Sequence, residues 1–295
     1  MIDGHTKLFG FLAHPAAHSL SPLIHNTSFK VTGINGTYLA FDVTSDGLEN
    51  TITALRSMHI GGVNLSMPLK TEVIPLLDEM TPRAKRLQAV NTIVNQNGKL
   101  IGDTTDGQGF VDALAQQGIS VAGKQLTVLG AGGAGRSIIA ALIDAGARQI
   151  NVFKRQNETF EKRKQQPESW SDVVSVIPYE NLEKMAASIE ASQIIVNTTN
   201  VGMSHDHALP ILQTMIDLLN SQQIVVDVIY FPLTTPFLEA AKKQGCQTFN
   251  GVGMLVHQAA GSFLEWTGKQ MPVKEVIAAV RQEVMRRRDV VKSVV

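Results

Sequence analysis

The chain has 295 residues, of which 44% are hydrophobic and 18% are charged. These proportions are those of an ordinary globular protein and exclude a disordered or fibrous chain. Its 26 basic residues balance its 26 acidic ones, so no overall charge attracts nucleic acid or a membrane surface. The basic run Arg286-Arg287-Arg288 is typical of the solvated last turns of a helix rather than of a phosphate site.

Several other kinds of site are excluded as well. Cys246 is the only cysteine, which rules out an intramolecular disulfide and a multi-thiolate zinc site. His14, His18 and His25 lie across a proline-interrupted turn without a neighbouring acidic or thiol ligand, so we expect no metal ion there. The N-terminus lacks the features of a secretion signal and no apolar run reaches membrane-spanning length, which predicts a cytoplasmic protein.

The chain begins with a predicted strand and a predicted helix. Residues 7–12 are largely apolar and predict the strand. Ser21 followed by Pro22 predicts a helix with Ser21 as its N-cap, running to about Val31. Ser19 and Ser21 therefore lie at a helix N-terminus, where their hydroxyls either only cap the helix or bind a small anion such as a carboxylate.

A lysine follows the third predicted strand. The patterns predict a strand at 37–42, an amphipathic helix at 45–57 and a strand at 60–65. The turn Ser66-Met67-Pro68 then leads into a helix that begins at Lys70. Lysine is usually a solvated surface residue, but this one lies outside the carboxyl end of a strand, where α/β sheets bind ligands.

A β-hairpin and an aspartate complete the first half. Residues 90–94, which include Asn91, and residues 100–102 predict two strands joined by a turn at 96–99. The return strand leads to Asp106-Gly107, which by itself predicts only an ordinary turn with a capping aspartate. A helix is predicted at 110–117.

A glycine-rich stretch organises the second half. After an apolar segment at 126–129, Gly130, Gly132 and Gly135 follow the G-x-G-x-x-G spacing and a helical segment continues to residue 145. Such glycines allow a sharp turn, the approach of a pyrophosphate to the backbone, and close packing of helix on strand. The N-terminus of that helix attracts phosphate groups. The strand–turn–helix context favours a dinucleotide site over an ordinary βα turn.

The segment after the next predicted strand bears on the choice of cofactor. An acid at this place usually binds the ribose of NAD, whereas an arginine suits the 2′-phosphate of NADP. The chain has both kinds of residue, because Lys154 and Arg155 are followed by Asn157 and Glu158. The sequence leaves the preference between NAD and NADP open.

The remaining strands and helices predict a doubly wound parallel sheet. The strands are expected at 149–153, 173–177, 193–197, 224–229 and 248–249, and the later helices at 234–244, from about 252 to Trp266, and at 273–291. Polar residues, among them Asn200 and Tyr230, follow two of these strands. The residues alone favour Tyr230 as a core aromatic over a substrate contact.

Together these segments resemble the shikimate dehydrogenase family. The motifs occur in the family's order over almost the whole chain: His18-Ser19-Leu20-Ser21-Pro22, Asn64 to Lys70, Ala89 to Thr92, Gly102 to Gly107, Gly130 to Ala134, Tyr230 with Thr235-Pro236, and Gly251 to Leu255 with Gln258 to Ala260. The resemblance implies a two-domain α/β protein with its active site in the cleft between the domains. A substrate domain is expected at 1–106, with the C-terminal helices of 253–295 packing back on it, and a Rossmann-like dinucleotide-binding domain at 107–252.

The resemblance also implies residue roles. Lys70 and Asp106 are the expected catalytic pair, with Lys70 exchanging a proton while hydride passes between the nicotinamide and a ring carbonyl. Ser19 and Ser21 are expected to bind the substrate carboxylate. The expected partners of the ring hydroxyls are Ser66, Asn91, Asp106, Tyr230 and Gln258. The expected cofactor-binding residues are Gly130, Ala131, Gly132, Gly133, Ala134, Gly135, Lys154, Arg155, Asn157, Glu158, Asn200, Val228, Ile229 and Gly251.

The implied function is the reversible, NADPH-linked reduction of 3-dehydroshikimate to shikimate in aromatic amino-acid (chorismate) biosynthesis. The expected partner is the small-molecule substrate alone, with neither nucleic acid nor a membrane, and a homodimer is one expectation for the assembly. Two further readings are a metabolite sensor without activity, which the presence of both Lys70 and Asp106 disfavours, and a folate-linked dehydrogenase, which the Ser19/Ser21 site disfavours.

The sequence departs from the family pattern at three places. Thr104 stands where the family usually has asparagine, and Asn250 stands where aspartate is common. The usual Asn-Arg-Thr-x-x-Arg clamp for the 2′-phosphate of NADP reads Lys-Arg-Gln-Asn-Glu-Thr at 154–159. That segment, with Ser66 and Met67, is more similar to the quinate/shikimate dehydrogenase branch, whose members accept NAD as well as NADP and quinate as well as shikimate. This branch is the alternative function.

Overall fold

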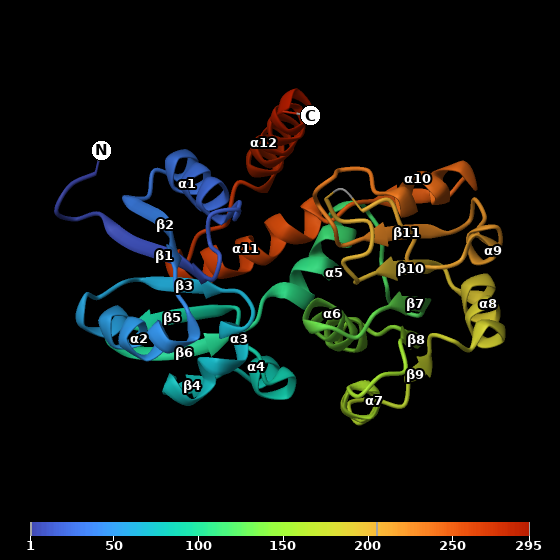
Figure 1. Cartoon of the computed structure of the whole chain (residues 1–295). Coiled ribbons are helices and arrows are strands. Elements are labelled where there is room, and N and C mark those ends of the chain that lie inside the picture. The colour runs from blue at the N-terminus through green and yellow to red at the C-terminus, as the bar shows by residue number, and fades with distance from the viewer. Residues whose placement is uncertain (1, 205, 295) are drawn as a thin grey trace. The chain divides into compact units, whose positions relative to one another are not determined.

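The computed structural model describes residues 2–204 and 206–294, and the side chains from Arg288 onward are outside that description. Contacts divide the chain into two compact units (Figure 1). The first unit comprises Met1–Gly109 and Val256–Gln282, and the second comprises Phe110–Leu255 and Glu283–Val295. The assignment of substrate and cofactor to 1–106 with 253–295 and to 107–252 stays a prediction.

The first unit contains a mixed sheet of six strands in the order β2-β1-β3-β5-β6-β4. The strands are β1 Lys7–Ala13, β2 Gly36–Asp42, β3 Gly62–Leu65, β4 Glu79–Met80, β5 Thr92–Gln96 and β6 Lys99–Asp103. β1 is parallel to β2 and β3, whereas β5 is antiparallel to β3 and β6. The end of β3 therefore lies beside the start of β5, and Asn64 is paired with Thr92.

Helices cover this sheet, and the apolar face of the helix at 48–57 is one that the sequence spacing predicts. They are α1 Ser21–Thr32, the 3-10 helix η1 Ser45–Gly47, α2 Leu48–Ser57, α3 Leu69–Glu72, the 3-10 helix η2 Ile74–Leu76, α4 Pro82–Leu87, most of α11 Val252–Thr267, and the start of α12 Val273–Val294. α2 buries Leu48, Ile52 and Leu55 in the core, and each such side chain contributes roughly 2 kcal/mol by leaving water. Trp266 Nε1 donates to the backbone oxygen of Ile93 at 3.0 Å and so anchors α11 on the sheet.

The start of α1 differs from the prediction. Leu20 is the N-cap, with φ -91° and ψ -5°, and Ser21 is the first helical residue. The Ser21 N–H donates to Ser19 Oγ at 3.1 Å. The prediction of Ser21 as N-cap is wrong because Leu20 already has helical backbone angles, so the hydroxyl that accepts a first-turn amide belongs to Ser19.

The second unit contains a parallel sheet in the order β12-β11-β10-β7-β8-β9. Its strands are β7 Gln125–Leu129, β8 Gln149–Lys154, β9 Val174–Pro178, β10 Ile194–Asn197, β11 Ile224–Asp227 and β12 Gln247–Phe249. Counted within this unit, the order is 6-5-4-1-2-3, that of a Rossmann sheet with its switch point between β7 and β10. The predicted fold class is confirmed.

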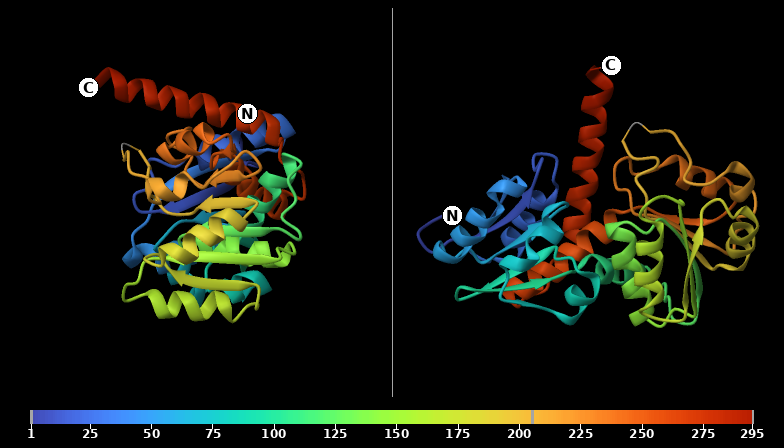
Figure 2. Two further views of the ribbon diagram at one scale, coloured as in Figure 1. Left: turned by 90° about the vertical axis from the view of Figure 1, so that its right-hand side faces the viewer. Right: turned by 60° about the horizontal axis from the view of Figure 1, so that its bottom comes forward.

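Helices lie on both faces of this parallel sheet (Figure 2). They are α5 Asp106–Gln116, α6 Gly133–Asp144, α7 Phe160–Glu168, α8 Leu182–Ala191, α9 Gln213–Ile216 and α10 Pro236–Lys243. Ile194 and Val196 of β10 join the core with α5, α6 and α7, whereas Ile195 joins the core with α8, α9 and α10, as the alternation of side chains along a strand requires. Within the described part of the chain, none of the helices is long and apolar enough to cross a membrane.

His25 is buried among aromatic rings of the first unit. Its imidazole stacks on Tyr38 with ring centroids 4.4 Å apart and lies 5.1 Å from Trp266. Neither ring nitrogen has a hydrogen-bond partner of normal geometry. Burial lowers the pKa of His25 to about 3, against a smaller opposing effect of Asn64. The imidazole is therefore neutral in the folded protein near pH 7.

We expect His25→Phe to reduce the acid sensitivity of the fold. The unfolded chain takes up a proton on His25 near its ordinary pKa of 6.5, but the folded chain does so only near 3. The stability linked to His25 is present above pH 6.5 and is lost as the pH falls through this window, at about 1.4 kcal/mol per pH unit. Urea unfolding at about pH 7, 6 and 5 measures this slope. The exposed control His5→Phe should keep the wild-type slope, and an unchanged slope in His25→Phe would contradict a buried neutral imidazole.

Candidate active site

Lys70 and Asp106 form an ion pair in the first unit. Lys70 lies on α3, shortly after β3 ends, and Asp106 is the first residue of α5, shortly after β6 ends. Lys70 Nζ is 2.6 Å from Asp106 Oδ2, and the two side chains are 21% and 15% exposed. The pair is partly shielded from water, which strengthens the attraction between its charges, yet a small molecule can reach it.

Asn91 binds Asp106 at the other carboxylate oxygen. Asn91 Nδ2 donates to Asp106 Oδ1 at 2.7 Å, so Lys70 and Asn91 divide the two oxygens between them. Asn91 Oδ1 accepts from the Thr105 N–H at 2.9 Å, and Asn91 Nδ2 also lies 3.4 Å from Gln258 Oε1. Because Asn91 is buried and its amide is engaged within the protein, it orients Asp106. Its contact with a ring hydroxyl stays a prediction.

A buried polar network extends from Asn91 into the sheet. Asn64 of β3 donates from Nδ2 to the backbone oxygen of Asn91 at 3.1 Å and to Ser262 Oγ of α11 at 2.9 Å. It accepts the Tyr38 hydroxyl at 2.9 Å. Burial raises the pKa of Tyr38 well above its ordinary value, although Ser21 and Asn64 contact it, so the phenol remains a donor. An unmade buried hydrogen bond costs about 1–3 kcal/mol, and this network therefore fixes the edge of the sheet.

The three serines predicted to bind substrate lie at this same edge. β1 and β3 are adjacent and parallel, so the loop after β1, with Ser19 and Ser21, lies beside the turn after β3, with Ser66. The Ser66 N–H donates to the backbone oxygen of Leu12 at 3.1 Å. Carboxylate binding by Ser19 and Ser21 stays a prediction, and the positive end of the α1 dipole supports it.

Three polar residues of this site are missed by the sequence reasoning: Asn64, Thr105 and Ser262. Asn64 interrupts the apolar strand Gly-Val-Asn-Leu, and Ser262 lies four residues after Gln258 on a largely apolar helix. Buried polar groups need hydrogen-bond partners. A polar residue within an apolar strand, and polar residues four apart on an apolar helix, are the signals that identify them.

In the second unit, the glycine turn combines tight packing with an open backbone. A Cβ at Gly135 would lie 2.6 Å from the Gly130 oxygen and 2.7 Å from Thr198 Oγ1, so only glycine lets α6 approach the strand this closely. A Cβ at Gly132 would meet nothing within 4 Å, and Gly132 and Gly133 are exposed. An open backbone at the start of a helix is what a pyrophosphate needs, so these residues fit a dinucleotide.

The segment predicted to select the cofactor follows β8. Lys154 Nζ donates to Asn157 Oδ1 at 2.6 Å, and burial lowers the pKa of Lys154. Arg155, Asn157 and Glu158 are exposed. Because β8 is the neighbour of β7, they lie at the same sheet edge as the glycine turn. The carboxamide oxygen of Asn157 is engaged by Lys154, and the contacts of Arg155 and Glu158 with a cofactor stay predictions.

A buried carboxyl group organises the loops after β10 and β11. Asp227 accepts hydrogen bonds from Asn197 Nδ2 at 3.1 Å, from the Ile229 N–H at 3.1 Å and from the Thr235 hydroxyl at 2.7 Å. Burial raises the pKa of Asp227 to about 6, against the effect of these three donors. The ends of β10 and β11 are thereby held together, one strand away from the switch point of the sheet.

The other residues predicted around the cofactor and substrate lie on the loops after β10, β11 and β12. Asn200 follows β10 and is exposed, and Val228 follows β11. A Cβ at Gly251 would lie 1.9 Å from the Val228 oxygen, so Gly251 is required for packing. Asn250 Oδ1 accepts from the Val252 N–H at 3.2 Å at the start of α11. Tyr230 is half-buried, and burial raises its pKa.

The two sites together indicate the class of protein. Among the described residues, no group of three or more His, Cys, Asp or Glu side chains is placed to hold a metal ion. The ammonium group of Lys70 lies beside a carboxylate in one α/β unit. The other unit is a Rossmann sheet with an open glycine turn. An ammonium–carboxylate pair and a dinucleotide-binding sheet define a nicotinamide-dependent oxidoreductase.

Comparison with known proteins agrees. Family models match residues 11–93, described as the shikimate dehydrogenase substrate binding domain, residues 113–228, described as shikimate/quinate 5-dehydrogenase, and residues 251–281, described as the shikimate 5′-dehydrogenase C-terminal domain. A protein of Streptococcus pneumoniae named shikimate dehydrogenase (NADP(+)) is 42% identical over 279 residues, which are 93% of this chain and 96% of the relative.

Solved structures agree as well. Shikimate 5-dehydrogenase from Listeria monocytogenes, in complex with shikimate and NAD, has a TM-score of 0.89 and 39% identity, covering 93% of this chain and 96% of that one. Quinate dehydrogenase from Corynebacterium glutamicum, in complex with NAD, has a TM-score of 0.85 and 26% identity, covering 94% and 99%. The chain belongs to the shikimate dehydrogenase family, as its motifs predict.

A pair of alanine variants separates the two roles of the glycine turn. Gly132 has φ -74° and ψ -162°, which alanine also adopts, and its Cβ is unobstructed. We expect Gly132→Ala to leave the melting temperature unchanged but to weaken NADP binding by about tenfold, because the methyl group enters the space that a pyrophosphate needs. Gly135→Ala should instead destabilise the protein by about 1–3 kcal/mol through overpacking. Calorimetric titration and thermal melts measure both effects, and wild-type affinity in Gly132→Ala would disprove the binding role.

Proposed function

We propose that this chain is a shikimate dehydrogenase, which interconverts 3-dehydroshikimate and shikimate in aromatic amino-acid biosynthesis. The observation that carries the proposal is the 2.6 Å Lys70–Asp106 ion pair, at the sheet edge that also bears Ser19 and Ser21. The 42% identity to a protein named shikimate dehydrogenase (NADP(+)) supports it. The roles of the individual site residues are part of the proposal.

The side chains of the site account for the proton in this reaction. Reduction of a ring carbonyl produces an alkoxide, and Lys70 donates a proton to its oxygen and becomes a neutral amine. In the oxidation direction the amine accepts the hydroxyl proton. Asp106 orients the lysine, and Ser19 and Ser21 hold the substrate by its carboxylate. General acid–base catalysis of this kind contributes about 10² to 10⁴ in rate, and the orientation of the substrate adds to it.

The cofactor of the proposal is NADP, with NAD as an alternative. When bound, the nicotinamide donates or accepts the hydride. The open backbone at Gly132 and Gly133 would hold the pyrophosphate. Arg155 would pair with a 2′-phosphate, and Glu158 would accept from a free ribose hydroxyl.

Quinate/shikimate dehydrogenase is the second candidate. The exposed Arg155 lacks the second arginine of the usual clamp, since residue 159 is threonine. The similarity to a quinate dehydrogenase in complex with NAD favours the same candidate function. A cytoplasmic location, a homodimer, and the lack of nucleic-acid and membrane partners stay predictions from the sequence.

Removal of the proposed acid–base group tests the function. We expect Lys70→Ala to lower kcat for shikimate oxidation by about a hundredfold or more, with a smaller change in shikimate affinity, because the variant loses the proton acceptor but keeps the serines. Steady-state kinetics and shikimate titration measure the two quantities. Lys30→Ala, at an exposed position of α1, is the control and should behave as wild type. Near-normal turnover in Lys70→Ala would overturn the assigned role.

A matrix of rates for shikimate and quinate with NAD and NADP tests the cofactor assignment. We expect measurable activity with both cofactors, because Arg155 and Glu158 are both exposed. Arg155→Ala should lower kcat/KM for NADP by about 10-fold or more and change that for NAD by less than about 2-fold, because only NADP carries the phosphate. A very large wild-type preference for one cofactor, or equal losses for both, would contradict this assignment.

A further inference from the structure

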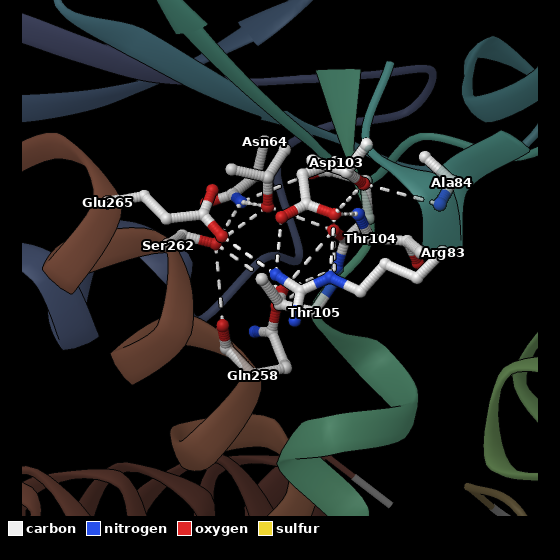
Figure 3. Close-up of polar contacts among 12 residues, drawn as sticks. Asn64, Arg83, Ala84, Asp103, Thr104, Thr105, Gln258, Ser262 and Glu265 are labelled. Atoms are coloured by element: carbon white, nitrogen blue, oxygen red, sulfur yellow. Dashed lines mark hydrogen bonds and ion pairs between the residues drawn. The ribbon is translucent and has the colours of Figure 1, made fainter. Parts of the chain in front are cut away.

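An arginine–carboxylate cluster lies in the same unit as the Lys70–Asp106 pair. It consists of Arg83 from α4, Asp103 at the end of β6 and Glu265 on α11 (Figure 3). Arg83 Nε donates to Asp103 Oδ1 at 2.7 Å, and Arg83 Nη2 donates to Asp103 Oδ2. The same Nη2 donates to Glu265 Oε1 at 2.8 Å. One guanidinium therefore joins three elements that are distant in sequence.

Asp103 connects the cluster to the catalytic loop. Its Oδ1 also accepts from the Thr104 N–H at 2.7 Å, and its backbone oxygen accepts from the Asn91 N–H at 3.0 Å. Asp103 is only 3% exposed. Because two residues separate it from Asp106, and because Asn91 binds Asp106, any displacement of Asp103 is passed on to the ion pair.

Glu265 connects the cluster to the substrate side of α11. Gln258, Ser262 and Glu265 are four and three residues apart, which places them on one face of the helix. Ser262 Oγ accepts from Asn64 Nδ2 at 2.9 Å in the middle of this row. The hydrogen bond from Arg83 to Glu265 fixes the other end of this row of three residues. It therefore sets the position of α11 along its axis, and with it the position of Gln258.

While Glu265 is protonated, the cluster carries one positive charge, on Arg83, and one negative charge, on Asp103. Among the described residues, Arg83 from α4 and Asp103 from β6 are the charged groups that act on Glu265. Burial raises the pKa of Glu265 to about 8, and the neighbouring carboxylate of Asp103 acts in the same direction. Arg83 and the other donors keep the pKa of Asp103 below its ordinary value in spite of its burial. Above about pH 8 a second negative charge appears beside Asp103.

We propose that Arg83, Asp103 and Glu265 are positioning residues, which hold Asp106 and Gln258 in place for the reaction at Lys70. The inference rests on the proposed function for its kinetic readout. A buried charge network is weak evidence for stability, since apolar residues of similar size often pack as well. A guanidinium donates hydrogen bonds in fixed directions to two carboxyl groups. This fixed geometry is what a catalytic loop requires.

A second arginine of the same unit provides a matched control. Arg56 Nη1 lies 2.5 Å from Asp78 Oδ2 and also donates to the backbone oxygen of Gly98. Its side chain is 33% exposed, against 39% for Arg83. Gly98 is in the turn between β5 and β6, whereas Asp103 is at the other end of β6, about 15 Å away by strand length. Substitution of Arg56 therefore removes a similar arginine–carboxylate interaction but leaves the loop from Asp103 to Asp106 unchanged.

We expect Arg83→Met to lower kcat/KM for shikimate by about tenfold or more, since misplacement by about 1 Å has effects of this size or larger. The KM for the cofactor should change by less than about twofold. Arg56→Met should lower the melting temperature similarly but leave kcat unchanged. Arg83→Lys keeps the positive charge but loses the planar guanidinium that contacts both carboxyl groups, so it should recover part of the activity. It is also the test variant if Arg83→Met fails to fold.

Glu265→Gln gives an independent readout from the pH profile. Glutamine remains neutral, so this variant should match wild type near pH 7 and retain more activity than wild type between about pH 8 and 9. Equal turnover in Arg83→Met and Arg56→Met, or identical alkaline profiles for wild type and Glu265→Gln, would overturn the positioning role. If wild type does not oxidise shikimate, the proposed function fails separately. A crystal structure of Arg83→Met then decides the positioning role, because an unmoved Asp106 rejects it.

Discussion

The first unit depends on the hydrogen bond from Asn91 Nδ2 to Asp106 Oδ1, at 2.7 Å. An exposed lysine–carboxylate pair without such support has many geometries and contributes about 0–1 kcal/mol. Asn91 is itself held, because its Oδ1 accepts from the Thr105 N–H and from the Thr92 hydroxyl. The carboxylate therefore has one orientation and presents Oδ2 to Lys70. The direction of the lysine follows from a buried amide rather than from the ion pair.

The second unit uses the same arrangement for a different purpose. Asn197 donates to the buried Asp227, as Asn91 donates to Asp106, and in both units a loop beyond a strand end is fixed by an asparagine–carboxylate bond. The surroundings decide the chemistry. Asp106 has a lysine partner and is partly exposed, which fits the catalytic role proposed for it. Asp227 has three uncharged donors and is fully buried, so it holds backbone in place beside the glycine turn.

Periodicity in the sequence predicts the long elements of both sheets, but not the short ones or the site. β4 has two residues and α4 has six, which is too short for a hydrophobic period to appear. Lys70 and Asp106 look like a surface lysine and a turn aspartate when taken singly, and only the family resemblance joins them. The bond between Asn64 and Ser262 spans 198 residues, and no local pattern contains such a partner. Arg83 and Glu265 are missed for the same reason, since each is an ordinary charged residue on its own helix.

The charges of the loop from Asp103 to Asp106 explain why two cations are needed there. The carboxylates of Asp103 and Asp106 lie within four residues of sequence, and each would attract a single cation placed between them. Arg83 occupies Asp103 through two nitrogens, and Lys70 contacts Asp106 through Nζ. The fork of the arginine suits a structural carboxylate, whereas the single ammonium of the lysine can release a proton. Because Asp103 has its own cation, the ammonium of Lys70 remains available to Asp106 and to a substrate oxygen, which is the condition that the proposed proton transfer at this site requires.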